Sequence, residues 1–160
     1  MIKQLQQQFR QPGKLQWIGL RPGKGLPLAS VSEVLADPAE GLQGDHYHGR
    51  SGKRQVTLIQ YEHFYVIEQL TGQAVTPAML RRNLVVAGIN LLALNKQYFQ
   101  IGDAVFLATG HCHPCSRMEK VLATGGYNAM RGHGGLTAQV IEKGSIRVGD
   151  EVVALPDLPI

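Results

Sequence analysis

Cysteines, aromatic residues and long hydrophobic runs are all scarce in this sequence. Two cysteines among 160 residues are too few for a disulfide scaffold. Four Phe, one Trp and five Tyr are too few for an RNA-binding surface that stacks bases on aromatic rings. The longest apolar segment, residues 84–94, falls short of the ~20 residues that span a membrane, and Gly88 and Asn90 interrupt it. We therefore expect neither a disulfide framework nor a membrane association.

Charge is also low, and it is unevenly distributed. Charged residues make up 18% of the chain, against a usual ~25%, and the net charge is +4. Five cations and no acid precede Glu33, namely Lys3, Arg10, Lys14, Arg21 and Lys24. This basic segment is either a solvated flank or an attraction for an anionic small molecule. No zinc-finger spacing, RNP signature or Lys/Arg block accompanies it, so nucleic acid is not expected as a partner.

Two features indicate a cytoplasmic domain that is rich in turns. The N-terminus lacks the apolar segment of a secretory signal, so we expect a cytoplasmic protein whose thiols stay reduced. Glycine is abundant, at 19 of 160 residues, well above the usual ~7%. Excess glycine without a collagen repeat indicates many turns and bulges, as in all-β folds. The length favours one domain.

Short apolar runs bounded by Gly, Asp or Asn dominate the chain and predict strands. They lie at residues 15–20, 31–35, 56–59, 84–86, 104–108, 138–141 and 152–155. Many short strands with turn signals favour a barrel or a sandwich. In addition, residues 99–106 and 146–153 both contain an apolar pair, Gly-Asp and a β run. This repeat predicts two equivalent corners of one barrel.

Few helices are expected. Residues 62–70 carry apolar side chains at three-residue spacing, and Gly72 can end that helix. Thr76 and Pro77 are typical of an N-cap and a first helical position, so a short helix at residues 78–82 should follow.

The densest group of reactive side chains is GHCHPCSRME, residues 110–119, which holds both cysteines and two of the six histidines. Ser116 and Glu119 match a capping box, so a helix should begin there. Cys115 would then lie one residue before the cap, where the partial positive charge of the helix end stabilises a thiolate. Arg117 would add positive charge. The pattern suits a nucleophile, a sulfur carrier or a soft-metal ligand.

Other interpretations of Cys112 and Cys115 remain open. They can be two small buried cysteines beside a turn. A zinc site is possible, but a strong zinc signal needs a second ligand pair, which the sequence lacks. A Cys-x-x-Cys redox pair needs a βαβ context, which the strand pattern does not provide. A reactive or metal-binding Cys115 is the remaining interpretation.

A second candidate group, residues 44–49, contains Asp45, His46 and His48. Residues at i and i+2 of a strand share one face, so the two histidines and the acid could bind a metal or act as acid–base partners. Alternatively, Asp45 bonds to its own backbone in a turn and the histidines lie on the surface.

Two further segments could bind a ligand. Arg81, Arg82 and Asn83 precede a predicted strand and can bind a phosphate or the edge of a heterocycle, or form a solvated helix end. Residues 130–135, with His133, form a Gly-rich turn that lets a ligand approach the backbone closely, or are only a loop.

Taken in order, these segments resemble a stand-alone MOSC domain, the module named from the C-terminal part of molybdenum cofactor sulfurases. The stretches that carry the resemblance are RPGKGLPLASV (21–31), GLQGDHYHG (41–49), RQVTLIQYEHF (54–64), LRRNLVVAGINLLAL (80–94), FQIGDAVFLATGHCHPCSRME (99–119) and MRGHGGLTAQVIEKGSIRVGDEVV (130–153). Their ordered combination is specific, although each alone is weak. We expect residues 1–160 to form a single such domain with its core at about 18–155, an N-terminal extension at 1–17 and a tail at 156–160.

The resemblance implies a mainly β fold, a closed or partly open barrel of the pyruvate-kinase-barrel type with a few short helices. It also implies that Cys115 is the functional residue. In amidoxime-reducing relatives the corresponding cysteine binds the molybdenum of a pterin cofactor, and in sulfurases it is thought to carry sulfur as a persulfide. Arg81 and Asn83 resemble the element that grips the pterin. Sulfurases carry a separate pyridoxal-phosphate domain, for which this chain has no room, so pyridoxal phosphate is not expected here.

Three functional hypotheses follow from this resemblance. The first is a molybdenum-cofactor oxidoreductase that reduces N-hydroxylated small molecules with electrons from a donor protein, a role linked to compact bacterial relatives. The second is a metal-free sulfur carrier, in which Cys115 accepts sulfur from a cysteine desulfurase. The third is a non-catalytic barrel that docks a partner protein.

The first hypothesis assigns a role to each candidate residue. Cys115 would be both the catalytic thiolate and the metal ligand. The pterin phosphate would be held by Arg81, Arg82, Asn83 and Arg117. Protons would be delivered by His46, His48 and His133. Because a barrel brings strand ends together at one mouth, we expect these residues around a single cavity with Cys115 at its floor.

Overall fold

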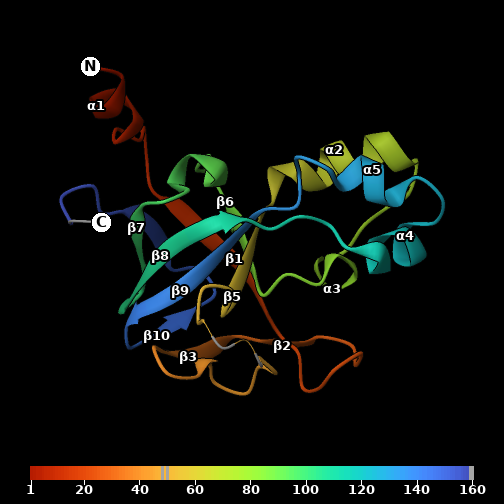
Figure 1. Cartoon of the computed structure of the whole chain (residues 1–160), viewed down its shortest axis with the longest axis horizontal. Helices are drawn as coiled ribbons and strands as arrows, with labels where there is room; N and C mark the ends of the chain where they lie inside the picture. The colour runs from red at the N-terminus through yellow and green to blue at the C-terminus, as the bar shows by residue number, and fades with distance from the viewer. Residues whose placement is uncertain (48, 50, 159–160) are drawn as a thin grey trace.

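A computed structural model describes residues 1–47, 49 and 51–158, which form a β-barrel with four of its short helices at one end and the N-terminal helix near the other (Figure 1). The strands are β1 (Gly13–Leu20), β2 (Ala29–Val31), β3 (Glu33–Asp37), β4 (Gly41–Leu42), β5 (Val56–Gln60), β6 (Leu84–Ala87), β7 (Tyr98–Ile101), β8 (Ala104–His111), β9 (Leu136–Glu142), β10 (Gly144–Arg147) and β11 (Glu151–Ala154). The helices are α1 (Ile2–Gln6), α2 (Glu62–Thr71), α3 (Pro77–Leu80), the 3-10 helix η1 (Leu91–Leu94), α4 (Ser116–Leu122) and α5 (Gly126–Met130).

The main sheet closes on itself. In the described part of the chain, its strands follow the order β11-β7-β8-β9-β5-β6-β1, and β1 pairs with β11 to complete a seven-strand ring. The pair β5–β6 is parallel, whereas the other described pairs of the ring are antiparallel. β2 extends from β1, and β10, β3 and β4 form a separate small sheet. The expected mainly β barrel with a few short helices is thus confirmed.

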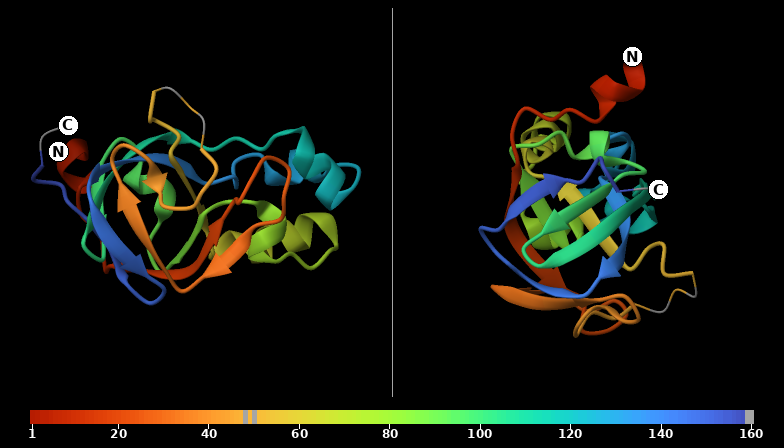
Figure 2. Two further views of the ribbon diagram at one scale, coloured as in Figure 1. Left: turned by 90° about the horizontal axis from the view of Figure 1, so that it is seen from below. Right: turned by 90° about the vertical axis from the view of Figure 1, so that its left-hand side faces the viewer.

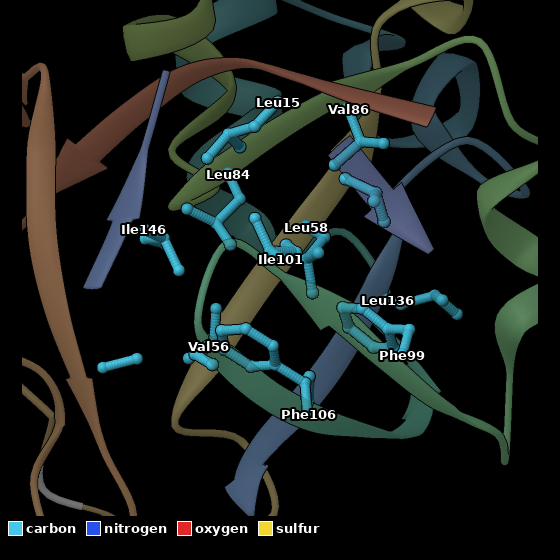
Figure 3. Close-up of a cluster of buried hydrophobic side chains, with 14 of the residues drawn as sticks. Leu15, Val56, Leu58, Leu84, Val86, Phe99, Ile101, Phe106, Leu136 and Ile146 are labelled. Carbon is cyan, nitrogen blue, oxygen red and sulfur yellow. The ribbon is translucent and has the colours of Figure 1, made fainter. Parts of the chain in front are cut away.

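The parallel pair β5–β6 determines where the helices lie. Parallel neighbours need a long crossover connection, and here it contains α2 and α3. Both strands are buried on both faces, as parallel strands usually are. Leu58 and Leu84 point into the barrel core, where Phe99 and Phe106 stack with ring centroids 5.3 Å apart (Figure 3). Ile59, of opposite orientation, contributes to a second core beneath the helices.

The second core holds the helices against the outside of the barrel. It contains Ile59 and Val85 from the parallel strands and Phe64, Ile67, Val75, Leu80, Met118, Leu122 and Met130 from the helical segments. As a result, α2, α3, α4 and α5 gather at the end of the barrel away from both chain termini (Figures 1 and 2). Within the described residues, no helix has both the length and the hydrophobicity needed to cross a membrane.

The helix boundaries agree with the sequence pattern only in part. α2 ends at Gly72, whose φ of 68° provides the left-handed stop that was expected. α3 ends at Leu80, two residues before the expected end, because Arg81 adopts the left-handed conformation with φ 59°. A left-handed residue cannot continue a right-handed helix, so the chain turns there into β6.

The repeated Gly-Asp pattern does not mark two equivalent barrel corners. Gly102 and Asp103 connect β7 and β8, which are neighbours in the ring. Gly149 and Asp150 instead connect β10, a strand of the small sheet, to β11 in the barrel. The prediction was wrong because a local turn signal carries no information about which sheet each flanking strand joins.

Gly135 offers a direct test of the packing between β9 and β5. Its φ is +90°, and a Cβ there would overlap the carbonyl oxygen of Leu58. At Gly149, φ is +97° but a Cβ would meet nothing within 4 Å. Gly149→Ala should therefore cost about 1 kcal/mol for backbone strain alone, and Gly135→Ala about 2–4 kcal/mol because a steric overlap is added. Urea unfolding of both variants measures the difference, and equal losses of stability would contradict the packing described here.

Candidate functional site

Three consecutive residues at the start of β6, Arg81, Arg82 and Asn83, point to three different parts of the molecule. Arg81 is half-buried, whereas Arg82 and Asn83 are 6% and 0% exposed. The left-handed turn at Arg81 separates the orientation of its side chain from that of the two residues that follow. The sequence predicted one anion-binding patch, but the three side chains have different hydrogen-bond partners.

The Asn83 amide is engaged entirely within the protein. Its Oδ1 accepts hydrogen bonds from the backbone N–H of Thr57 at 3.0 Å and from the Thr57 hydroxyl at 3.2 Å. Its Nδ2 donates to the Gly19 carbonyl at 3.0 Å and to Asp45 Oδ1 at 3.2 Å. An amide has one acceptor oxygen and two N–H donors, so all of its groups are used. Asn83 therefore connects β1, β5, β6 and the segment around Asp45.

Asp45 bonds to Arg21 as well as to Asn83. The Asp45 side chain is 0% exposed, and its Oδ2 accepts a hydrogen bond from Arg21 Nη2 at 2.9 Å. Its Oδ1 also accepts from Arg21 Nε at 3.2 Å and from the Arg21 backbone N–H at 2.7 Å. A bidentate Arg–carboxylate pair has a defined geometry as well as a strong attraction. The Asp45 side chain therefore holds the Arg21 guanidinium in place, through contacts that an isolated Asx turn would not make.

Arg82 is a buried cation whose N–H groups are satisfied by backbone carbonyls. Its Nε donates to Gly134 at 2.9 Å, Nη1 to Leu80 at 3.1 Å and Nη2 to Cys112 at 3.4 Å. Burying a charge is costly unless hydrogen bonds compensate it. By bonding to both Gly134 and Cys112, Arg82 joins the Gly-rich segment to the cysteine segment and sets their mutual position.

Arg81 is the member of the trio that faces Cys115. Its Nη2 donates to the Leu26 carbonyl at 3.1 Å. Burial lowers the pKa of Arg81, and the nearby cations Arg117 and Arg21 lower it further, whereas the Cys115 sulfur raises it. Arg81 is therefore within electrostatic reach of each of the other three side chains. We call Arg21, Arg81, Cys115 and Arg117 the Cys115 cluster.

Cys115 lies at the exact start of α4 rather than one residue before its cap. It is the N-cap residue, with φ −116° and ψ 174°, and its thiol is free and exposed. No side-chain hydrogen bond caps α4 within the described residues, so the expected capping box of Ser116 and Glu119 is absent. The exposure also differs from the expectation that Cys115 forms the floor of a cavity. Its neighbour Cys112 is 5% exposed.

Glu119 caps the next helix instead of its own. Its carboxylate accepts hydrogen bonds from the backbone N–H of Tyr127 at 2.9 Å and of Gly125 at 3.0 Å. These bonds, that from Tyr127 above all, hold the pKa of Glu119 below its usual range. The contact joins α4 to α5 and thereby fixes the orientation of the helix on which Cys115 stands.

The two predicted histidines that the structure describes, His46 and His133, have different neighbours. The His46 backbone N–H donates to the Arg21 carbonyl at 2.6 Å, which places the His46 backbone beside that of Arg21. His133 instead packs against His63 of α2, with ring centroids 5.1 Å apart in an edge-to-face arrangement. Burial, together with His133, lowers the pKa of His63. His133 Nδ1 is buried without a hydrogen-bond partner among the described residues. His48 lies outside the described residues.

Sequence reasoning missed Arg21 as part of the site. Its contact with Asp45 spans 24 residues of sequence, and its reach to Arg81 spans a still longer separation. Local spacing carries no signal for such contacts. The available indications were the basic N-terminal segment, which was compatible with attraction of an anionic ligand, and the position of Arg21 at the start of the stretch 21–31 that resembles the family.

Several solved structures share this fold. The YuaD protein from Bacillus subtilis matches with a TM-score of 0.78 and 19% identity, covering 91% of this chain and 97% of that chain. YiiM from Geobacillus stearothermophilus has a TM-score of 0.74 and 18% identity, with coverages of 90% and 75%. YiiM from Escherichia coli has a TM-score of 0.69 and 19% identity, with coverages of 89% and 69%. At such low identity, the likeness shows the fold alone.

The sequence itself provides the assignment to a family. A comparison with curated proteins finds no match. The profile of the MOSC domain, however, matches residues 44–153. This range includes Asp45, Asn83 and Cys115, and it covers more than half of the chain. Together with the closed barrel, this match shows that the chain belongs to the MOSC domain family.

Proposed function

We propose that this chain binds a molybdenum cofactor through the Cys115 thiolate and takes part in the reduction of N-hydroxylated compounds. The observation that carries the proposal is the Cys115 cluster, in which an exposed free thiol lies within electrostatic reach of Arg81, and Arg81 within reach of Arg117 and Arg21. A thiolate is a soft metal ligand, and guanidinium groups bind phosphate. Both are needed to hold a metal that is carried by an anionic pterin.

The donor set of the described residues fits such a group better than it fits a bare metal ion. Among them, no group of three or more His, Cys, Asp and Glu side chains could hold a metal. A metal at Cys115 would therefore take its remaining ligands from a cofactor that brings its own. Asp45 compensates the charge of Arg21, which leaves Arg81 and Arg117 as the cations for a phosphate.

In this proposal, some residues would contact the cofactor directly and others would position them. Cys115 would anchor the metal, and Arg81 and Arg117 would hold the cofactor phosphate. Arg82 and Asn83 would act indirectly, because their polar groups bind the protein backbone and Asp45. His46 is the better placed candidate for proton delivery, since its backbone is bonded to Arg21, whereas His133 packs against His63. Imidazole titrates near neutral pH and suits this task.

The proposed reaction converts an N-hydroxylated group to the corresponding N–H compound and water. The N–O bond breaks, and two electrons and two protons enter. The electrons would come from a reduced electron-transfer protein, which is the partner that this function requires. When bound, the cofactor would supply the two-electron redox change, while the protein would supply its anchor, the anion grip and a proton donor.

The exposure of Cys115 also favours the second candidate, a metal-free sulfur carrier. An exposed thiol can accept sulfane sulfur from a cysteine desulfurase and pass it to an acceptor protein. The two candidates differ in a simple observable. A cofactor protein retains molybdenum after purification, whereas a carrier lacks it and shows an additional sulfur atom on Cys115 by mass spectrometry.

Substitution of the thiol tests the anchor. Cys115→Ser should reduce molybdenum retention and N–O reduction by at least about tenfold, which corresponds to ~1.4 kcal/mol, because a hydroxyl is a harder and weaker ligand. The buried Cys112→Ser is the matched control and should retain the metal. Metal analysis and turnover of both proteins provide the measurement. Unchanged molybdenum content and turnover in Cys115→Ser would show that Cys115 is not the anchor.

Neutralising the cations tests the anion grip. Arg81→Gln and Arg117→Gln should each weaken cofactor retention by about tenfold, or ~1.4 kcal/mol, since each removes a charged hydrogen-bond donor from the phosphate. Arg147→Gln is the control, because Arg147 is bonded to Glu33 at the small sheet. Retention would be compared after identical dialysis of the loaded proteins. If all three variants lose cofactor equally, the Cys115 cluster is not where the phosphate binds.

A further inference from the structure

A hollow of about 670 Å³ lies beside the cysteine segment, and the proposed cofactor site does not account for it. It is lined by His113, Pro114, Tyr127, Asn128, Arg131 and Gly132. These residues come from the segment before α4 and from α5 and the turn that follows it. Its volume lies within the usual range for small-molecule sites, about 300–1,000 Å³. Pro114, a lining residue, is directly followed by Cys115, so the cysteine backbone adjoins the hollow.

The charge of the hollow favours an anion. Arg131 is exposed, and within the described residues its guanidinium makes no hydrogen bond or ion pair. His113 adds a ring N–H donor to the lining. The described lining contains no Asp or Glu. Glu119 bonds to the backbone of the lining residue Tyr127. Its carboxylate accepts hydrogen bonds from the backbone N–H groups of Tyr127 and Gly125.

The side chains of the walls favour an aromatic ligand. Tyr127 is 41% exposed, so one part of its ring is available to a ligand while its backbone is held by Glu119. Aromatic rings stack on one another in offset or edge-to-face arrangements, so a planar ring can pack against Tyr127. The Asn128 amide offers both a donor and an acceptor.

We propose that this hollow recognises small aromatic acids, with Arg131 binding the carboxylate and Tyr127 packing against the ring. Bidentate pairing makes arginine the side chain suited to a carboxylate. If the hollow is the substrate site for the chemistry at Cys115, the inference rests on the proposed function. It then narrows the substrate class to anionic aromatic N-hydroxylated compounds. As a binding site, it can be tested without any turnover.

The binding test is an NMR titration of the full-length protein with benzoate, with neutral benzamide of the same shape, and with acetate, which lacks the ring. We expect benzoate to shift the backbone signals of Tyr127, Asn128 and Gly132, and to bind at least tenfold more tightly than benzamide or acetate. Arg131→Gln should weaken benzoate binding about tenfold, and Tyr127→Ala should weaken benzoate more than acetate. Lys120→Gln, an exposed cation on α4, should change neither. Equal binding of benzoate and benzamide, or unchanged benzoate binding in Arg131→Gln, would overturn the proposal.

A turnover comparison distinguishes failure of this site from failure of the proposed function. With cofactor-loaded protein and a reductant, we expect 4-carboxybenzamidoxime to have a lower KM than benzamidoxime, and Arg131→Gln to raise the KM of the carboxylated substrate more than that of the neutral one. Reduction of both substrates with equal KM would contradict the anionic substrate class. Benzoate binding as predicted without reduction of either substrate would contradict the proposed function and leave the aromatic-acid site supported.

Discussion

Two buried polar side chains at the beginning of β6 hold the rest of the site in position. Arg82 donates to three carbonyl groups, and Asn83 bonds to Thr57, Gly19 and Asp45. Leaving one such buried partner unsatisfied costs about 1–3 kcal/mol, so the surrounding loops are strongly constrained. Both residues directly precede β6, which pairs with β5 from Leu84 onward, so they are held next to a rigid strand pair. The cysteine segment, the Gly-rich segment and the segment around Asp45 are therefore positioned by the barrel and not by their own turns.

This arrangement allows several cations to lie close together. Arg21 and Arg117 both lie within electrostatic reach of Arg81, and their repulsion contributes to the lowered pKa of Arg81 after the larger effect of burial. Asp45 compensates Arg21 only. A surplus of positive charge beside the exposed Cys115 attracts an anion. An anionic cofactor would relieve the repulsion, which gives the cluster a physical reason to bind one.

Much of the fold could be predicted from local sequence, but much of the site could not. The β-branched runs predicted the barrel strands, and Gly72 predicted the end of α2, because both signals act over a few residues. The roles of Arg82 and Asn83 depend on partners that are distant in the sequence. Asn83 bonds to Thr57 and Gly19, which are 26 and 64 residues away. Arg82 bonds to Gly134 and Cys112, which are 52 and 30 residues away. A surface patch and a buried clamp have the same local sequence, so only the tertiary fold separates them.

The capping-box motif correctly predicted a helix start beside Cys115, but the residue contacts that it implies are not the ones observed. Ser116 and Glu119 suggested a capping box, which placed a helix start beside Cys115. The helix does start there, but Cys115 is the N-cap and Glu119 turns toward α5. Glu119 prefers the α5 backbone because the short connection between α4 and α5 brings two unpaired N–H groups within its reach. Such a contact requires knowledge of how two helices pack.

X-ray absorption spectroscopy at the molybdenum edge tests the central claim most directly, because it counts the sulfur atoms bound to the metal. The cofactor-loaded protein and its Cys115→Ser variant, reconstituted with the same cofactor, would be compared. Our account predicts that the native protein has one more sulfur ligand than the variant, contributed by the Cys115 thiolate. Identical sulfur coordination in the two proteins would contradict it.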